Sequence, residues 1–342
     1  MHHSPITIRS RRLRGASAAI AGIAALGVAL AGCSSTAGPD PDTGDPAAEE
    51  RGSLTFVAGV KGDPFYITMS CGAQAAAEEA GLSFDFQAPN SFSPTDQIPI
   101  VDGVAAAAPS ALLIAPTDGA AMFAPIQRVV DAGTNVVLVD TALDDSSTVR
   151  SSVRTDDYAG GVEAAKLLAE LIGGSGEVLL LNFQAGVSTT EARGKGFVDT
   201  AEQLGLTVVG QEYGGTDIEK GAQIVDATLQ RHPNLAGVFT TTDYGAQGTV
   251  ASLRNAGELG SVKVVGFDAS PVMVEQLRAG DIQGIVSQQA RTIGELGVEQ
   301  ALAAMNGEAT SESVIEVPTV TIRAEDLESE SAKAGLQVER CN

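Results

Sequence analysis

The chain has 342 residues, enough for about two domains that bury their own cores without disulfide or metal support. Hydrophobic residues make up 44% of it, aromatics only 4%, and Trp is absent, so global disorder is excluded and the cores must be built from Ala, Val, Leu and Ile. The formal net charge of −22 argues against a nucleic-acid partner, because such a surface repels phosphate backbones.

Residues 1–32 have the layout of a secretory signal peptide. Four arginines lie within residues 9–14, and residues 16–32 are uncharged and rich in Ala, Gly, Leu and Ile. The alternative is an uncleaved membrane helix. The apolar run is near the lower length limit for a span, and its Ala and Gly content makes it a poor anchor. We therefore expect this segment to be removed.

The apolar run ends in LAGC at 30–33, which resembles the lipobox of bacterial lipoproteins. The resemblance implies that Cys33 is lipidated and becomes the first residue of the mature chain. Residues 33–53 are rich in Pro, Gly, Ser, Thr and acidic residues, which predicts a flexible tether. We expect an extracytoplasmic protein of the cell envelope, held at the membrane by its lipid anchor alone.

Two further cysteines, Cys71 and Cys341, form an even pair in a compartment that permits disulfides. A bridge between them would tie the C-terminal tail to the first helix after the tether. The sequence also allows two unrelated reduced thiols, because it gives no distance between them.

From residue 54 onward, short apolar runs alternate with Ala-rich stretches of helical spacing. Runs such as VVLV before Asp140 are almost continuously apolar, which is typical of strands buried on both faces of a parallel sheet. The pattern predicts an α/β fold of two doubly wound parallel-sheet lobes. We expect the polar tail after Arg323 to lie on the surface. The expected strands are 54–60, 82–87, 111–115 and 135–140, then 177–181, 206–212, 236–240, 262–267 and 283–287, and a late strand within 314–322.

Signatures of catalysis are missing from the sequence. It contains no P-loop, no G-x-S-x-G, no H-E-x-x-H, no C-x-x-C and no G-x-G-x-x-G after the first expected strand. His232 is the one histidine beyond the signal, which disfavours His-based catalysis and a His-rich metal site. We predict that the chain is not an enzyme and uses no cofactor or metal.

Polar and aromatic residues follow several expected strands, at the edge where open α/β sheets bind ligands. Carboxylates suit sugar hydroxyls because each offers two acceptor oxygens, and aromatic faces can cover the C–H face of a sugar ring. Taken singly, each residue has a simpler interpretation, as a helix N-cap or as the first turn of a buried helix. Their coincidence at equivalent strand ends favours a binding site. These residues are Asp63, Phe65, Tyr66, Asp140, Thr141, Thr242, Asp243 and Asp268.

Between residues 54 and 322 the chain resembles the ribose-type periplasmic sugar-binding proteins of ABC importers. The motifs that carry the resemblance include GDPFY at 62–66, LIAPTD at 113–118, VVLVDT at 136–141, EARGKGF at 191–197, VFTTTD at 238–243 and VVGFDASP at 264–271. The resemblance implies the type I periplasmic-binding-protein fold, whose lobes are joined by a three-segment hinge and close over a sugar. The implied crossings lie near 154–156, 288–289 and 316–320. Lobe one would then comprise 54–155 plus 289–317, lobe two 156–288 plus 318–323, and the tail 324–342.

The family's sugar contacts can be carried over residue by residue. Asp63 stands where the family usually has Asn, and Thr141 and Glu191 stand where ribose binders have Arg. The departures at Thr141 and Glu191 remove cations, which leaves the identity of the sugar open. We expect a neutral pentose, hexose or sugar alcohol, with an amino sugar as the alternative. The implied ligand set is Asp63, Phe65, Tyr66, Asp140, Thr141, Glu191, Arg193, Thr216, Thr242, Asp268 and Gln288.

The resemblance implies a monomer that delivers its sugar to an ABC transporter permease. A receptor of the same fold, passing a sugar or an autoinducer-like signal to a membrane partner, is not separated from this by sequence. A LacI-type repressor shares the fold but needs a basic helix-turn-helix before the first strand, where this chain has a signal and tether. An enzyme on the same scaffold would need a nucleophile–base pair or metal cluster that the expected site lacks.

Overall fold

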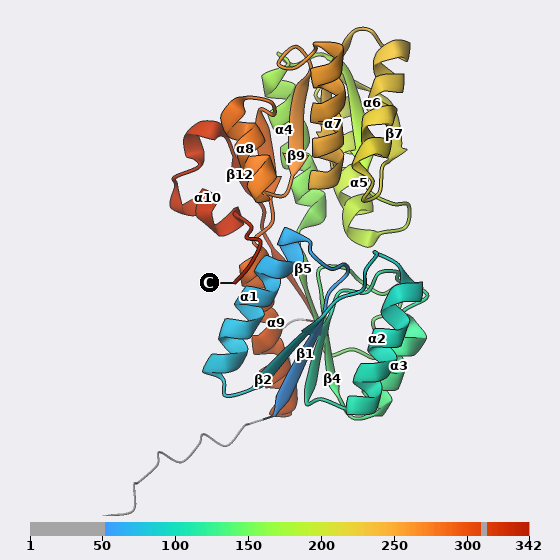
Figure 1. The fold of residues 1–342 in the computed structure, drawn as a ribbon, viewed down its shortest axis with the longest axis vertical. Coiled ribbons are helices and arrows are strands. Elements are labelled where there is room, and N and C mark those ends of the chain that lie inside the picture. The colour runs from blue at the N-terminus through green and yellow to red at the C-terminus, as the bar shows by residue number, and fades with distance from the viewer. Residues whose placement is uncertain (1–51, 309–312, 342) are drawn as a thin grey trace, which may run out of the picture. The chain divides into compact units, whose positions relative to one another are not determined.

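The described part of the chain folds around two six-stranded sheets in a computed structural model (Figure 1). The structure describes residues 52–308 and 313–341, which all belong to one compact unit. The expected signal, the lipidation site Cys33 and residues 33–51 of the expected tether lie outside the described residues. Within the described residues, no helix combines the length and apolar character needed to cross a membrane.

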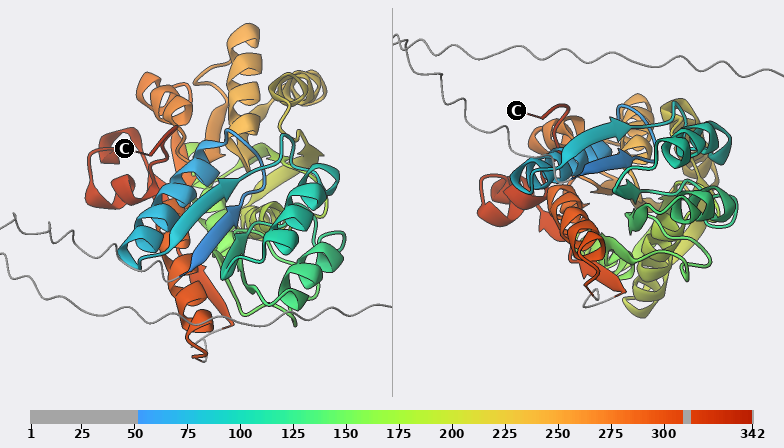
Figure 2. Two further views of the ribbon diagram at one scale, coloured as in Figure 1. Left: turned by 60° about the horizontal axis from the view of Figure 1, so that its bottom comes forward. Right: turned by 90° about the horizontal axis from the view of Figure 1, so that it is seen from below.

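The first sheet, with its helices, is here called lobe one. Its strands are all parallel and run in the order β11-β5-β4-β3-β1-β2. Alternate strand side chains pack against α1 and α9 on one face and against α2 and α3 on the other (Figures 1 and 2). This double cover explains the continuous apolar runs. The elements are β1 (Ser53–Val57), α1 (Pro64–Glu79), β2 (Ser83–Gln87), α2 (Pro94–Ala107), β3 (Ala111–Ile114), α3 (Phe123–Asp131), β4 (Asn135–Val139), β5 (Ser151–Thr155), α9 (Ala290–Met305) and β11 (Val314–Val317).

The second sheet, with its helices, is here called lobe two. Its order is β12-β10-β9-β8-β6-β7, and only β12 runs antiparallel to its neighbour. Helices α4 and α5 cover one face, and α6, α7 and α8 cover the other. The elements are α4 (Asp157–Leu171), β6 (Gly176–Asn182), α5 (Ser188–Gln203), β7 (Leu206–Tyr213), α6 (Ile218–Arg231), β8 (Leu235–Thr240), α7 (Asp243–Ala256), β9 (Lys263–Phe267), α8 (Pro271–Ala279), β10 (Gly284–Ser287) and β12 (Val320–Ile322).

Within the described residues the chain passes between the two sheets three times, from β5 to α4, from β10 to α9 and from β11 to β12. The expected single late strand is therefore two strands, one in each lobe. Pro318 lies between them, and proline cannot donate to a strand ladder. The sequence also missed β5, because its composition, SSVRT, is polar although most of the strand is buried.

The tail after Arg323 was expected on the surface, and most of its described residues are exposed, but Leu327, Ala332, Gly335 and Gln337 are buried. A 3-10 turn (Ala324–Asp326) and α10 (Glu330–Gly335) follow β12, and Leu327 and Ala332 are buried in the core of lobe two. The Cys71–Cys341 disulfide is present, with 5.3 Å between the two Cα atoms. A few small and apolar residues and one covalent bond therefore hold a segment whose overall composition is polar.

Candidate ligand-binding site

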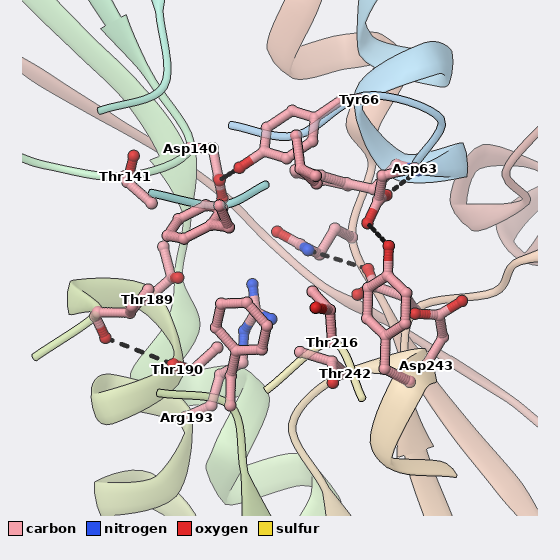
Figure 3. A pocket seen from close by; sticks show the side chains of 18 residues that line it. Asp63, Tyr66, Asp140, Thr141, Thr189, Thr190, Arg193, Thr216, Thr242 and Asp243 are labelled. Carbon is pink, nitrogen blue, oxygen red and sulfur yellow. Dashed lines mark hydrogen bonds between the residues drawn. The ribbon is translucent and has the colours of Figure 1, made fainter. Parts of the chain in front are cut away.

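A cavity of about 490 Å³, which includes space open to solvent, lies between the lobes at the C-terminal ends of their strands. Parallel strands end at one edge of a sheet, so the loops after them gather there. Figure 3 shows the lining side chains converging on the cavity from both lobes. The structure brings together ten residues of the predicted ligand set, namely Asp63, Phe65, Tyr66, Asp140, Thr141, Arg193, Thr216, Thr242, Asp268 and Gln288.

Asp140 and Asp268 hold equivalent positions, directly after β4 in lobe one and β9 in lobe two. Their φ angles are 62° and 77°, the left-handed region that few residues other than Gly and Asn or Asp adopt. Neither is a helix N-cap, since Asp156 caps α4 and Ser270 caps α8. The N-cap interpretation is therefore excluded for both. Such backbone strain gathers at functional sites.

Each of these carboxylates is held through one oxygen. Tyr66 donates its hydroxyl to Asp140 Oδ2 at 2.7 Å. Gln288 and Gln337 both donate their side-chain amides to Asp268 Oδ1, each at 2.9 Å. Asp140 Oδ1 and Asp268 Oδ2 accept no hydrogen bond from the described residues, which leaves one acceptor oxygen in each lobe for a ligand.

Asp63 has two roles. Its Oδ1 accepts from the Phe65 backbone N–H at 2.8 Å and caps α1, as Asp commonly does. Its Oδ2 accepts from the Tyr244 hydroxyl of lobe two at 3.0 Å. A hydrogen bond therefore joins the lobes across the cavity.

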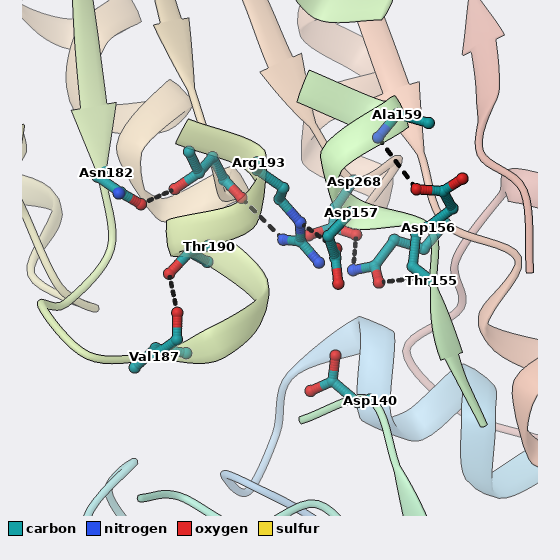
Figure 4. A network of polar contacts seen from close by, with 12 residues as sticks. Asp140, Thr155, Asp156, Asp157, Ala159, Asn182, Val187, Thr190, Arg193 and Asp268 are labelled. Atoms are coloured by element: carbon teal, nitrogen blue, oxygen red, sulfur yellow. Dashed lines mark hydrogen bonds and ion pairs between the residues drawn. The ribbon is translucent and has the colours of Figure 1, made fainter. Parts of the chain in front are cut away.

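Arg193 is the one Lys, Arg or His side chain among the lining residues, and its Nε and Nη1 both have partners. Its Nε lies 2.7 Å from Asp157 Oδ1 (Figure 4), and its Nη1 donates to the Thr241 carbonyl at 3.0 Å. Its guanidinium carbon lies 4.0 Å from the Phe267 ring centroid. All these partners are in lobe two. The arginine is therefore anchored in lobe two, and its positive charge also acts to lower the pKa of Asp140 and Asp268.

Burial dominates the electrostatics of the lining acids. It raises the pKa of Asp63 to about 6, with the negative charge of Asp268 as the second cause, and that of Asp140 to about 7, against the attraction of Arg193. Burial likewise raises the pKa of Asp243 to about 7 and raises that of Asp268. A site with this excess of carboxyl groups needs hydrogen-bond donors from its ligand. The part of the chain that the structure describes contains no group of three or more His, Cys, Asp or Glu placed to hold a metal ion.

Glu191 was predicted to contact ligand, but it does not line the cavity. It lies in the first turn of α5, where its Oε1 accepts from the Gly186 backbone N–H at 3.2 Å and from the Tyr213 hydroxyl at 3.1 Å. Arg193 pairs with Asp157 and not with Glu191. We therefore remove Glu191 from the ligand set.

Several lining residues were missed. Phe92 of lobe one and Phe183 of lobe two meet edge to face, with ring centroids 5.3 Å apart. Phe183 directly follows β6, so the strand-end rule could have found it, whereas Phe92 lies in the β2–α2 loop and no motif marks it. The other missed lining residues are Val60, Val187, Thr189, Thr190 and Tyr244, while Asp243 was noticed as a strand-end residue but left out of the ligand set.

Comparison with known proteins agrees with this geometry. The family described as periplasmic binding protein domain matches residues 54–309. A D-ribose/D-allose-binding protein of Pseudomonas aeruginosa is 29% identical over 289 residues, which are 80% of this chain and 90% of the relative. A ribose import binding protein of Bacillus subtilis is 28% identical over 255 residues, 74% of this chain and 81% of the relative.

Solved structures extend the similarity to the fold. An ABC transporter solute binding protein from Agrobacterium vitis, bound with α-D-tagatopyranose, has a TM-score of 0.80 and 32% identity, and the match covers 84% of this chain and 99% of that one. The prediction of two α/β lobes in a binding protein that is not an enzyme is therefore confirmed. Since the family match takes in both lobes, this chain belongs to the periplasmic binding protein family.

Proposed function

We propose that the protein captures a small neutral carbohydrate, a pentose, hexose or sugar alcohol, in the cavity between its lobes. The observation that carries the proposal is the pair Asp140 and Asp268. Each presents, from its own lobe, one carboxylate oxygen that accepts no hydrogen bond from any residue the structure describes, and a polyhydroxyl ligand can donate to both. The aromatic side chains of Phe65, Tyr66 and Phe183 line the same cavity and can cover the C–H faces of a ring.

The neutral donors already in place support a neutral ligand. Tyr66, Tyr244 and the two glutamines, all neutral, donate hydrogen bonds to the lining carboxyl groups, and the charge of Arg193 favours the ionised form of Asp140 and Asp268. The names of the relatives, which refer to ribose and allose, and the tagatose in the A. vitis structure support a monosaccharide. An amino sugar is the second candidate, because the lining contains Asp63, Asp140, Asp243 and Asp268 and only one, already paired, arginine.

We also propose that the sugar is delivered to an ABC transporter permease after the lobes close about the three crossings, near 154–156, 288–289 and 316–320. In this proposal the signal is removed, Cys33 is acylated, and residues 33–53 tether a monomer to the outer side of the membrane. Metabolic labelling with a lipid precursor, with mass spectrometry of the N-terminal peptide, tests the anchor. An unmodified Cys33 or cleavage elsewhere contradicts it.

The binding proposal is tested by thermal-shift screening against D-ribose, D-allose, D-tagatose, sugar alcohols and D-glucosamine. A ligand that binds only the folded form raises the melting temperature by mass action, by an amount that grows with its concentration. We expect one class of neutral sugar or sugar alcohol to raise the melting temperature and to be recovered chemically unchanged. Chemical turnover would favour an enzyme, and no shift with any compound would overturn the proposal. If cells that lack the gene still take up the sugar but no longer respond to it, the receptor alternative is favoured.

A further inference from the structure

The segment 335–341 runs past the cavity end of lobe two. Ser287 Oγ donates to the Gly335 carbonyl at 2.7 Å, Leu336 forms a parallel bridge with Ala269, and the Gln337 N–H donates to the Ala269 carbonyl at 3.0 Å. These contacts place Gln337 beside the end of β9, where only 6% of it is exposed. Its side-chain amide donates to Asp268 Oδ1 at 2.9 Å.

Directly after Gln337 the chain crosses to lobe one. The Val338 N–H donates to Thr68 Oγ1 in α1 at 2.7 Å, and Cys341 is bonded to Cys71 in the same helix. In Figure 1 this last segment leaves α10, which packs on lobe two, and reaches α1. The tail is thus a fourth connection between the lobes, and its lobe-one end is covalent.

The helix that receives the tail also carries the lobe-one part of the cavity. Phe65 and Tyr66 lie in the first turn of α1, and Tyr66 holds Asp140. A chain end is poorly ordered unless it is tied down, and a disulfide ties it by removing freedom from the chain. The disulfide at Cys71 therefore restrains the position of the backbone beside Gln337 relative to both lobes.

We infer that Gln337 is a positioning residue for Asp268, the carboxylate that we propose contacts the sugar, and that the Cys71–Cys341 disulfide holds Gln337 in place. Gln288 and Gln337 both donate to Oδ1 and so restrain the carboxyl group, while Oδ2 accepts no hydrogen bond from the described residues and is left for the ligand. The tail lies beyond residue 309, where the family match ends, so the family match does not account for this device. The inference rests on the proposed function in one respect, that Asp268 contacts the sugar.

The test compares Gln337→Leu, which removes the amide at similar volume, with the double variant Cys71→Ser/Cys341→Ser. Glu339→Ala is the matched control, since Glu339 is exposed on the same tail. In ligand-free protein, carbon NMR of the Asp268 carboxyl group, assigned with Asp268→Asn, follows its titration. We expect its pKa to rise in Gln337→Leu, because a hydrogen bond to the ionised form is lost, and to rise in the double variant as the tail loosens.

Hydrogen exchange of the amides in 336–341 tests the disulfide separately. We expect exchange at least ten-fold faster in the double variant, and in wild-type protein that has been reduced and alkylated, which avoids dependence on the folding of a variant. We expect the affinity for the sugar found among D-ribose, D-allose, D-tagatose and the sugar alcohols to fall about ten- to hundred-fold in Gln337→Leu. Glu339→Ala should change none of these values.

Unchanged titration of Asp268 and unchanged affinity in Gln337→Leu would overturn the positioning role. Unchanged exchange in both disulfide-free forms would overturn the role of the bond. If no sugar binds the wild-type protein, the proposed function fails, while the ligand-free titration and exchange still decide this inference.

Discussion

The aspartates Asp140 and Asp268 owe their chemistry to the residues that hold them. Each sits in a left-handed backbone conformation after a buried strand, with one oxygen fixed by neutral donors. Burial without a free cation raises the pKa of both carboxyls. Burying these charged groups therefore lowers the stability of the folded protein, and it leaves carboxylates that are suited to accept hydrogen bonds from a ligand.

At pH 8, above the pKa of Asp140, Asp140→Asn and Asp268→Asn should each weaken sugar binding about ten- to hundred-fold, because an amide offers one acceptor oxygen where a carboxylate offers two. Folding should be retained. Asp131→Asn is the matched control, since Asp131 is exposed at the end of α3, next to the N-terminal end of β4, and does not line the cavity. Titration calorimetry measures the affinities, and values within two-fold of wild type in both aspartate variants would mean that these residues do not hold the ligand.

The stability of the ligand-free protein should depend on Asp140 in a defined direction. Its folded pKa of about 7 exceeds the usual 3.8, so the folded state binds more protons than the unfolded state between these values. The stabilising contribution is present below about pH 4 and is lost as pH rises through about 7. One pKa unit corresponds to about 1.4 kcal/mol, so Asp140→Asn should be more stable than wild type at pH 8 by roughly 1 to 4 kcal/mol.

Urea unfolding of ligand-free wild type and Asp140→Asn at pH 4 and pH 8 measures this difference. The advantage of the variant should vanish at pH 4, where the wild-type carboxyl is protonated in the folded state. A difference in the free energy of unfolding that is the same at both pH values would contradict the assignment of the raised pKa.

At the scale of elements, glycines set the helix pairs that carry the site. In lobe one, a Cβ at Gly72 or Gly294 would lie 2.2 Å from the Arg291 carbonyl oxygen or 2.1 Å from the Met69 carbonyl oxygen, respectively. Helices α1 and α9 therefore pack backbone to backbone. In lobe two, a Cβ at Gly161 would lie 2.0 Å from the carbonyl oxygen of Arg193, so α4 and α5 pack in the same way. Close packing of these two helices brings Asp157 to the arginine.

Gly294→Ala should lower the free energy of unfolding by about 1 to 3 kcal/mol or more, because the new methyl group meets backbone that cannot rotate away. Gly103→Ala in α2 is the control. Nothing lies within 4 Å of its added Cβ, so helix propensity alone predicts a neutral or slightly stabilising change. Denaturant unfolding compares the two. Equal stabilities would show that α1 and α9 can move apart at no cost.

At the scale of the whole protein, the lobes meet through side-chain contacts across the cavity. Tyr244 in lobe two donates to Asp63 in lobe one, and Phe92 meets Phe183 across the cavity. Contacts that form only when the lobes close stabilise the closed state. If such a contact is lost, the closed state is less populated, and a ligand that binds this state binds more weakly.

Tyr244→Phe should therefore weaken sugar binding by about ten-fold, mostly through faster dissociation, since it removes a hydrogen bond to a carboxylate and keeps the ring. Tyr158→Phe is the control, because Tyr158 is 43% exposed and bonds Asp199 within lobe two. Stopped-flow measurements separate the rates. Identical dissociation rates in the two variants would mean that the Tyr244 bond does not contribute to closure.

Much of this protein follows from sequence alone. Buried strands between helices must be apolar throughout, so runs such as VVLV predicted the parallel sheets, and strand ends predicted where Asp140, Thr242 and Asp268 would gather. Local pattern carries such information because a continuous apolar run favours a strand buried on both faces, and the first polar residues after the run mark where that strand ends.

Only the tertiary structure decided the rest. Glu191 turns to Gly186 and Tyr213, and Arg193 is held by Asp157, because side-chain direction depends on partners distant in sequence. The sequence did not predict the strand β5 or the buried residues of the tail for the same reason, because their burial comes from contacts that composition does not reveal. Gln337 reaches Asp268 across a sequence separation of 69 because β12, α10 and the disulfide bring it there, and no local pattern specifies a contact made by three-dimensional packing.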